Sequence, residues 1–399
     1  MNKRIFNIGI IGYGGFGKFL HTHWGELENA RVTAIADQSA PQLKHLAGIK
    51  TFADWRELLQ DPAIDLVAIV TEPGTHEEIA NASMVAGKHV LIEKPLATTL
   101  SAARKIIEVR DQTGMVAGID FIMRYNPLLR AIRDFTDRSV FGKLRRVDVE
   151  NYAQDGQLPP THWFWDRERS GGILIEHAVH FIDLVHFIAP AKALSVNGLK
   201  HDRNPQQEDQ IMANVLYEGG LIATHYHSFA RPGFFEMTTI KLGFDLADLE
   251  LEGWIPLRGE LKCLVNQETK QALLASPFFE FGAAVPIENV HDESRPAGWG
   301  VSDQSDMAAR QGVRSGNILY DVTEVLTGKL QIGRAKQDVY ADCVRASLLD
   351  ILKKIENPEH HLTASLETGL DSLDIAVLAT VSARKQHTND TAYKPFLSF

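Results

Sequence analysis

The sequence predicts an α/β protein in which a doubly wound parallel sheet comes first and an α+β domain with a mostly antiparallel sheet follows. A glycine-rich turn of spacing G-x-G-x-x-G follows a short β-branched run near the start. Strand-like and helix-like segments then alternate to about residue 122, whereas from about residue 143 polar and apolar residues alternate one by one. At 399 residues the chain is long enough for two domains, which we place at 1–122 and 123–399.

The first strand and its turn form the motif around which the amino-terminal domain is organised. Ile5–Ile11 is apolar and is predicted to be a buried strand. Gly12 permits a tight turn, Gly14 lets the backbone approach a pyrophosphate, and Gly17 lets the next helix pack closely. That helix, Lys18–Leu27, offers N–H groups to phosphates at its start. We therefore expect a dinucleotide to bind along Gly12-Tyr13-Gly14-Gly15-Phe16-Gly17.

An acidic residue after the second strand indicates which dinucleotide binds. Arg31–Ala36 is β-like and ends at Asp37, 20 residues after Gly17, where a carboxylate meets the ribose hydroxyls. A carboxylate there repels a 2′-phosphate, so NAD is expected in preference to NADP. The alternative is that Asp37 only begins a turn before Pro41.

The rest of the first domain continues the alternation of strands and helices. Helices are predicted at Asp54–Leu59, His76–Ala86 and Thr99–Thr113, and strands at Asp65–Val70, Lys88–Ile92 and Met115–Ile119. In such a sheet the ligand lies beyond the carboxyl ends of the strands. The loops there direct attention to Asp120–Asn126 and assign five further residues to the cofactor site, namely Thr71, Pro73, His76, Glu93 and Lys94.

The second half of the chain is predicted to form an antiparallel sheet with one solvated face. Its strands are expected at Arg145–Tyr152, Gln210–Tyr217, Leu221–Phe229, Phe235–Leu242 and Leu246–Trp254, with a hairpin turn at Glu218-Gly219-Gly220. Residues 268–316 are expected to be loops or an insertion. Val339–Lys354 and Leu366–Arg384 are helical by period and are expected to pack back beside both domains.

The composition excludes several classes of partner. A net charge of −10 argues against nucleic acid or an anionic membrane. There is no run of about 18 apolar residues, so no transmembrane helix is expected, and the chain is interpreted as mature from residue 1. Two cysteines, Cys263 and Cys343, suit a reducing cytoplasm.

Two further stretches carry candidate chemistry. Glu93-Lys94-Pro95 holds a lysine on a stiff loop after a strand. Ser170–Leu184 is predicted to be a buried helix with one polar stripe, Glu176, His180 and Asp183, at spacing i, i+4, i+7. Burying that stripe unpaired costs several kcal/mol, so a cleft is its cheaper place. The alternative is a structural His–Asp network.

At these residues the chain resembles the Gfo/Idh/MocA oxidoreductases over essentially its whole length. The marks are the glycine turn, Glu93-Lys94-Pro95, Arg124 with Asn126-Pro127, the Gly171-Gly172 helix with His180 and Asp183, and the closing segment Thr363–Arg384. The resemblance implies a Rossmann domain followed by an α/β domain with a large open sheet, mostly antiparallel here, that builds homodimers or homotetramers. It also implies that Lys94 and His180 lie at the nicotinamide.

The chain departs from the family pattern at two places. Glu176 stands where the family usually has Asp; we keep it with the catalytic residues. His162, Trp163 and Trp165 lie in an unusually aromatic segment that could wall a carbohydrate pocket, or simply pack under the sheet. The substrate site is predicted to consist of these residues with Lys94, Arg124, Tyr125, Glu176, His177 and His180.

The predicted chemistry is alcohol oxidation or its reversal on a sugar or cyclitol. NAD takes the hydride, while His180 has a suitable pKa to take the hydroxyl proton. Lys94 stabilises the developing alkoxide and, as a neighbouring cation, lowers the pKa of His180. Metal catalysis is not expected, because His177 and His180 lack the H-E-x-x-H pattern and no cysteine lies near them in sequence.

Two alternatives stay open. The first is an NAD-dependent glycosidase acting by oxidation, elimination and reduction, with Tyr125 or His225 as the extra base. The second is a cofactor-sensing regulator. His225 and His227 share one face of a strand and are expected either in the cleft or at the surface.

Overall fold

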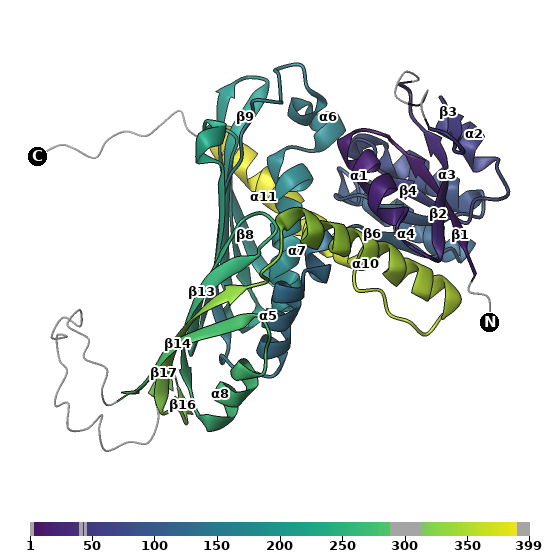
Figure 1. Cartoon of the computed structure of the whole chain (residues 1–399). Coiled ribbons are helices and arrows are strands. Elements are labelled where there is room, and N and C mark those ends of the chain that lie inside the picture. The colour runs from purple at the N-terminus through teal and green to yellow at the C-terminus, as the bar shows by residue number, and fades with distance from the viewer. Residues whose placement is uncertain (1–3, 40–42, 44–45, 288–312, 316, 389–399) are drawn as a thin grey trace, which may run out of the picture.

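The computed structural model describes residues 4–39, 43, 46–287, 313–315 and 317–388. Two large sheets dominate this described part of the chain, with a layer of helices between them (Figure 1). The smaller sheet and its helices lie at one end, and the large sheet forms the opposite end.

The amino-terminal sheet has six parallel strands in the order β3-β2-β1-β4-β5-β6. The strands are β1 (Phe6–Ile11), β2 (Ala30–Ala36), β3 (Lys50–Phe52), β4 (Leu66–Ile69), β5 (His89–Ile92) and β6 (Ala117–Ile119). The order reverses between β1 and β4, so a ligand crevice is expected at their carboxyl ends. The predicted doubly wound sheet is confirmed, although β3 was not predicted.

Four helices cover this sheet where the sequence places them. They are α1 (Gly15–Trp24), α2 (Trp55–Leu59), α3 (His76–Val85) and α4 (Leu100–Thr113). The side chains of Asp54 and Thr99 accept backbone N–H bonds at the starts of α2 and α4. Gly114 ends α4 with φ +67°, a conformation that glycine adopts readily.

The second sheet has nine strands in the order β14-β17-β13-β12-β11-β7-β10-β9-β8. The strands are β7 (Leu144–Tyr152), β8 (Ala193–Asn204), β9 (Gln207–Tyr217), β10 (Ile222–Ser228), β11 (Met237–Phe244), β12 (Ala247–Glu252), β13 (Arg258–Val265), β14 (Phe279–Pro286) and β17 (Glu324–Gln331). Every neighbouring pair is antiparallel except β7 and β10. The mostly antiparallel sheet is confirmed, but β8, β13 and β17 were missed.

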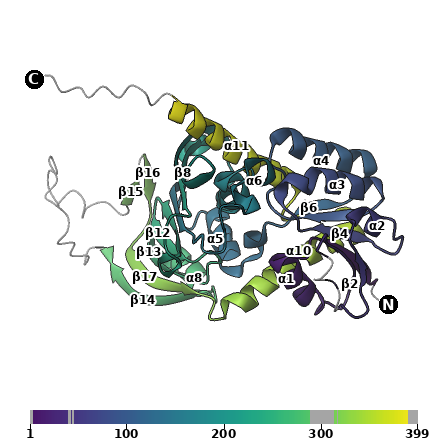
Figure 2. The ribbon, with the colours of Figure 1, turned by 90° about the horizontal axis from the view of Figure 1, so that it is seen from above.

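Helices from the second half cover the inner face of this sheet. α11 (Leu366–Thr388) runs along β8, and α7 (Val179–Ile188) lies between α11 and α5 (Pro127–Asp137), a helix that was not predicted. α10 (Lys336–Glu356) packs instead on the first domain beside α1 (Figure 2). There the Trp24 indole donates to the carbonyl of Val344 at 3.0 Å. The division at residues 122 and 123 stays a prediction.

Residues 268–316 were predicted to be loops or an insertion, and the first alternative is wrong for the described part, which contains regular elements. α8 (Gln267–Leu274) begins with a capping box between Asn266 and Thr269. β14 pairs with β17 at the sheet edge, with an irregular register between Phe281 and Ala284 that obscures its alternation. A small hairpin of β15 (Val313–Ser315) and β16 (Ile318–Tyr320) follows, while 288–312 and 316 lie outside the described residues.

The segment leading into α7 is the most apolar helix of the described chain. Arg167–Ile188 is long and apolar enough to cross a membrane by length and composition alone, but 83% of its most apolar window is buried inside the protein. It comprises α6 (Arg167–Ser170), a π-helical turn (Leu174–Ala178) and α7. This burial is what a core helix between two sheets requires, as the sequence predicted for Ser170–Leu184.

Candidate active site

The glycine turn has the geometry of a phosphate cradle. Gly12 has φ +96°, and a Cβ there would lie 2.4 Å from the carbonyl oxygen of Val70. A Cβ on Gly17 would lie 2.2 Å from the carbonyl oxygen of Gly12. By contrast, a Cβ on Gly14 or Gly15 would meet nothing within 4 Å. The turn is therefore tight against the protein on one side and open on the other, where the uncapped start of α1 presents its N–H groups.

Asp37 is bound to this turn. Its Oδ2 accepts from the backbone N–H of Tyr13 at 2.6 Å, and its Oδ1 accepts from the N–H of Ser39 at 2.7 Å. Each carboxylate oxygen keeps lone-pair capacity for a further donor. Asp37 thus shapes the local turn and places its carboxylate beside the cradle.

His76 connects the loops that follow β4 and β5. Its ring nitrogens lie 2.8 Å from the carbonyl oxygen of Pro95 and 3.2 Å from that of Thr71. The side chain is fully buried, and burial lowers its pKa to about 4. Because no part of it is exposed, His76 holds the two loops together, and its predicted contact with the cofactor has no support in the structure. Pro73 is likewise buried.

The pair of Lys94 and Glu176 joins the two domains at the carboxyl edge of the small sheet. Lys94 Nζ donates to Glu176 Oε1 at 2.7 Å and to the Glu176 carbonyl at 3.0 Å, and both side chains are almost buried. Burial opposes charge on Lys94, but the carboxylates of Glu176 and Glu93 raise its pKa. Burial likewise opposes charge on Glu176, but Lys94 keeps the pKa of that carboxyl low. The pair is therefore ionised, and one ammonium hydrogen remains for a further acceptor.

His180 lies near this pair and is only 5% exposed. Burial, together with the charge of Lys94, holds its pKa well below the ordinary value, so the ring is neutral at pH 7. Within the described part of the chain it makes no hydrogen bond, and it packs against the rings of Phe121 and Trp254. A neutral, unbonded imidazole beside an ammonium can accept a proton from a group bound there.

Asp183 does not share this site. It is 1% exposed and accepts from Arg124 at Nε (2.8 Å) and Nη2 (2.7 Å). Arg124 Nη1 donates in addition to the Thr363 carbonyl at 2.8 Å. Glu176 belongs to the π-helical turn at Leu174–Ala178 and pairs with Lys94, whereas Asp183 belongs to α7 and pairs with Arg124. The predicted polar stripe is therefore divided between two ion pairs. Arg124 is thus committed to a structural ion pair, contrary to its predicted contact with substrate.

Tyr125, also predicted to touch substrate, is buried and donates to Asp350 on α10 at 3.0 Å. His177 is half-buried, and its Nε2 lies 2.8 Å from Asn151 Oδ1, while burial lowers its pKa to about 4.

His225 and His227 on β10 are fully buried, and their ring nitrogens have no hydrogen-bond partner among the described residues. Their expected place in the cleft or at the surface is therefore wrong.

The aromatic segment after β7 is mainly packing. Phe164 and Trp165 are buried, and the Trp165 indole donates to the Leu158 carbonyl at 3.0 Å. Trp163 is half-buried beside His162, with ring centroids 5.3 Å apart. This favours the packing alternative for Trp165, while Trp163 and His162 keep some exposed surface.

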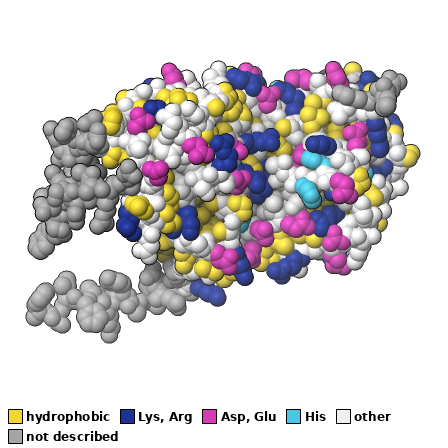
Figure 3. Space-filling model, turned by 90° about the horizontal axis from the view of Figure 1, so that it is seen from below, with side chains coloured by type: hydrophobic (Ala, Val, Ile, Leu, Met, Phe, Trp, Pro, Cys, Tyr) yellow, Lys and Arg dark blue, Asp and Glu magenta, His cyan; other side chains and the backbone are white. Residues whose placement is uncertain are grey.

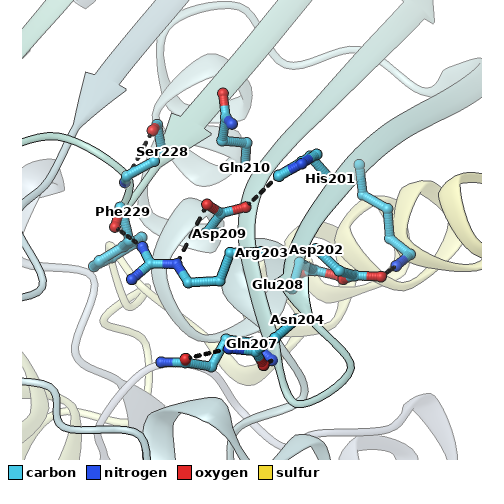
Figure 4. A network of polar contacts seen from close by, with 12 residues as sticks. His201, Asp202, Arg203, Asn204, Gln207, Glu208, Asp209, Gln210, Ser228 and Phe229 are labelled. Carbon is cyan, nitrogen blue, oxygen red and sulfur yellow. Dashed lines mark hydrogen bonds and ion pairs between the residues drawn. The ribbon is translucent and has the colours of Figure 1, made fainter.

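A polar network at the β8–β9 hairpin supports this region from outside (Figure 4). Arg203 donates to Asp209 and to the carbonyl of Phe229, and its guanidinium lies 5.6 Å from the centre of the Trp165 ring. The Phe229 ring in turn packs 5.2 Å from the ring of His177. The network therefore holds the backbone at Phe229, whose ring packs on His177.

Sequence reasoning missed two aromatic residues next to the site. Trp254 follows β12, and its ring lies 5.6 Å from that of His180. Tyr340 of α10 lies 5.4 Å from Trp254 and 6.1 Å from Phe16 of the glycine turn. Neither residue belongs to a motif, and both come from elements that converge only in the folded chain.

A carboxyl pair was only partly anticipated. Asp120 follows β6, accepts from the Ser347 hydroxyl at 2.5 Å, and has its pKa raised by burial to about 6. Burial and the neighbouring Asp120 raise the pKa of Glu93 well above its ordinary value.

No group of three His, Cys, Asp or Glu side chains among the residues that the structure describes is placed to hold a metal ion.

Comparison with known proteins agrees with this architecture. Residues 6–121 match the model of an oxidoreductase family with an NAD-binding Rossmann fold, and residues 129–241 match the GFO/IDH/MocA C-terminal domain. A 1,5-anhydro-D-fructose reductase of Ensifer adhaerens is 32% identical over 186 residues, which is 45% of this chain and 55% of that protein. A scyllo-inositol 2-dehydrogenase (NAD(+)) of Bacillus subtilis strain 168 is 28% identical over 222 residues, 52% of this chain and 63% of that protein.

The match to these curated relatives therefore spans little more than half of their own length. Among solved structures, a levoglucosan dehydrogenase in complex with NADH and L-sorbose has a TM-score of 0.71 at 18% identity, covering 96% of this chain and 98% of that one. That likeness shows the fold. Taken together, the two family models cover more than half of the chain, in the order and at the places that the two sheets occupy. The chain belongs to the Gfo/Idh/MocA oxidoreductase family.

Proposed function

We propose that this protein is an NAD-dependent oxidoreductase that transfers hydride between the nicotinamide and a ring CH–OH group of a sugar, a cyclitol or a related compound. The observation that carries the proposal is the ionised Lys94–Glu176 pair beside the neutral, unbonded imidazole of His180. Lys94 follows the carboxyl end of β5, at the same edge of the parallel sheet at which the glycine turn follows β1.

The roles of the residues follow from their charges. NAD, when bound, supplies the hydride acceptor. Lys94 directs its remaining N–H toward the substrate oxygen and stabilises negative charge that develops there. His180 takes the hydroxyl proton, because its lowered pKa leaves the lone pair free at pH 7. Glu176 keeps Lys94 charged and fixed in position.

Asp37 supports NAD rather than NADP. Its carboxylate lies beside the cradle, bound to two backbone N–H groups, and can accept from ribose hydroxyls but repels a 2′-phosphate. Relatives of the chain are named for both cofactors, including a scyllo-inositol 2-dehydrogenase (NADP(+)) of Bacillus subtilis strain 168. The proposed preference of this chain for NAD over NADP therefore rests on the carboxylate of Asp37 and not on its relatives.

The substrate class is proposed from the relatives together with the site. The relatives are named as a 1,5-anhydro-D-fructose reductase and as scyllo-inositol and myo-inositol 2-dehydrogenases. Acidic and basic side chains are interspersed on the face drawn in Figure 3, as suits a protein whose partners are small molecules rather than nucleic acid or a membrane. Both cysteines are buried and unpaired, which accords with a cytoplasmic protein.

The outer face of the large sheet is the proposed contact of a homodimer or homotetramer. A groove of about 870 Å³ runs over this face, lined by charged side chains of both signs such as Arg146, Lys241, Glu250, Glu260 and Lys262. Paired charges of opposite sign on one face can be self-complementary across a two-fold axis. Sedimentation at two salt concentrations tests this, and a monomer at low salt contradicts it.

The glycosidase alternative has less support. The two bases considered for it are Tyr125, whose hydroxyl is bound to Asp350, and His225, which is fully enclosed. Neither can reach a substrate carbon without rearrangement.

A Lys94→Met variant tests the proposed role of the ammonium. It should retain NAD(H) binding, measured by nicotinamide fluorescence, but lose turnover by about 100-fold or more. Lys88→Met is the matched control, because Lys88 is also buried but only donates to the carbonyls of Asp61 and Ile64. Full turnover in Lys94→Met would overturn the assignment.

A further inference from the structure

His180 lacks the partner that usually orients a catalytic imidazole. In a catalytic histidine, the ring nitrogen that does not react normally donates a hydrogen bond to a carboxylate or a carbonyl, and this bond fixes the plane of the ring. Here the two acidic side chains of the same helical segment are engaged elsewhere, Glu176 with Lys94 and Asp183 with Arg124. Throughout the described residues, no hydrogen bond is made to the ring. Another contact must therefore hold it.

Two aromatic rings provide that contact. Phe121, two residues after the end of β6, lies 6.3 Å from the imidazole with an angle of 61° between the planes. Trp254, in the turn between β12 and β13, lies 5.6 Å from it at 85°. Both arrangements are edge-to-face, a geometry that aromatic rings favour and that restricts rotation of the smaller ring. The imidazole is thus held between two elements from different domains.

Trp254 is itself fixed in place. Its turn is anchored by Gly253 N–H, which donates to the Thr238 carbonyl at 2.8 Å, and by Asn126 Nδ2, which donates to the Pro256 carbonyl at 2.9 Å. Gly253 has φ +92°, so the turn depends on a glycine before the tryptophan. The indole also contacts Tyr340 at 5.4 Å and lies 5.9 Å from Lys336 Nζ.

We propose that Trp254 is the positioning residue for His180: it sets the plane of the imidazole and excludes water from one side of it. The proposal rests on the proposed function, in which His180 exchanges the substrate proton. Orientation of the imidazole is thereby assigned to the turn between β12 and β13, because the motif residues Lys94 and Glu176 make no hydrogen bond to His180.

The charged surroundings agree with this role. Lys94, in the loop after β5, and His177, in the π-helical turn, act electrostatically on the imidazole. Lys336 and Tyr340 of α10 contact Trp254. Burial is the largest cause of the lowered pKa of His180, ahead of Lys94 and His177. Removal of the indole exposes the ring to water and raises that pKa.

Kinetics of Trp254 variants provide the first test. Trp254→Ala should lower kcat by about 10–100-fold, because a displaced base costs that much, while the KM for NAD changes little. Trp254→Phe should recover most of the activity, since it keeps an edge-to-face ring. Trp55→Ala is the control, because Trp55 is a half-buried tryptophan of the first domain whose ring stacks on Arg56. Equal kcat in Trp254→Ala and wild type overturns the proposal.

An NMR titration without substrate separates the proposal from the function. Histidine ring carbons are labelled, and the His180 signal is identified by its loss in His180→Gln. The titration midpoint should rise toward about pH 6.5 in Trp254→Ala and stay low in Trp254→Phe. An unchanged midpoint contradicts the positioning role even in an active enzyme. A shifted midpoint in a protein without any turnover supports positioning and overturns the proposed function. If Trp254→Ala does not fold, Trp254→Leu replaces it in both tests.

Discussion

Replacement of Asp183 by asparagine tests whether this residue serves stability rather than chemistry. The carboxylate is 1% exposed and receives three hydrogen bonds from Arg124, at 3.1, 2.8 and 2.7 Å. The amide introduced by Asp183→Asn would keep one acceptor oxygen but would turn an NH2 group toward the guanidinium and leave its charge uncompensated. Breaking a buried pair on one side costs about 3–5 kcal/mol, a large part of a typical free energy of unfolding.

Urea denaturation followed by circular dichroism measures that loss. Asp134→Asn is the matched control, because Asp134 pairs with Arg138 at the end of α5 but is 60% exposed, and its loss should cost under about 0.5 kcal/mol. Folded Asp183→Asn should keep turnover within a few-fold of wild type. A loss below about 1 kcal/mol, or an intact fold with turnover lowered about 100-fold, would refute the reasoning and return Asp183 to the reacting site.

Three further predictions concern charge. Asp37→Ala should weaken NAD binding about 10–100-fold in fluorescence titrations while NADP binding changes less, because hydrogen bonds to a carboxylate are lost together with its repulsion; equal losses for both cofactors would contradict it. Glu176→Gln removes the carboxylate that raises the pKa of Lys94, so the alkaline limb of the pH–rate profile should move about one to three pH units lower, and an unmoved limb would count against the pair. Burial lowers the pKa of His225 to about 3, so below about pH 6.5 only the unfolded chain takes up this proton, and the free energy of unfolding falls. In urea denaturation, wild type should lose about 1.4 kcal/mol more free energy of unfolding between pH 7.5 and 5.5 than His225→Leu does. Equal losses in the two proteins would refute this prediction.

Local signals allowed the first domain to be predicted closely. The glycine spacing, the β-branched run before it and the capping residues Asp54 and Thr99 all act within a few residues, so the sequence carries them directly. β3 was missed because only three residues, Lys50–Phe52, pair there, and none of them is fully buried. β14 and its partner β17 were missed because their pairing depends on distant parts of the chain.

The candidate site could be predicted only where sequence motifs supplied its residues. Lys94 and Glu176 were both predicted to be catalytic residues, but their ion pair, at 2.7 Å, was not predicted. The ion pair of Asp183 was not predictable from the helical period, because its partner, Arg124, comes from a turn that lies 59 residues earlier in the chain. Trp254 could not be predicted, since its contact with His180 joins the turn after β12 to α7, two parts of the second half of the chain that lie far apart in sequence.

Absorbance in the reduced-nicotinamide band tests the proposed hydride transfer most directly. The purified protein is incubated with NAD and, in turn, with each of a panel of cyclitols, sugars and glycosides. His180→Ala is measured beside wild type. We predict NADH formation with at least one cyclic polyol or sugar, and its loss in the variant although NAD still binds. No NADH from any of them with NAD demonstrably bound, or equal rates in both proteins, would contradict the account.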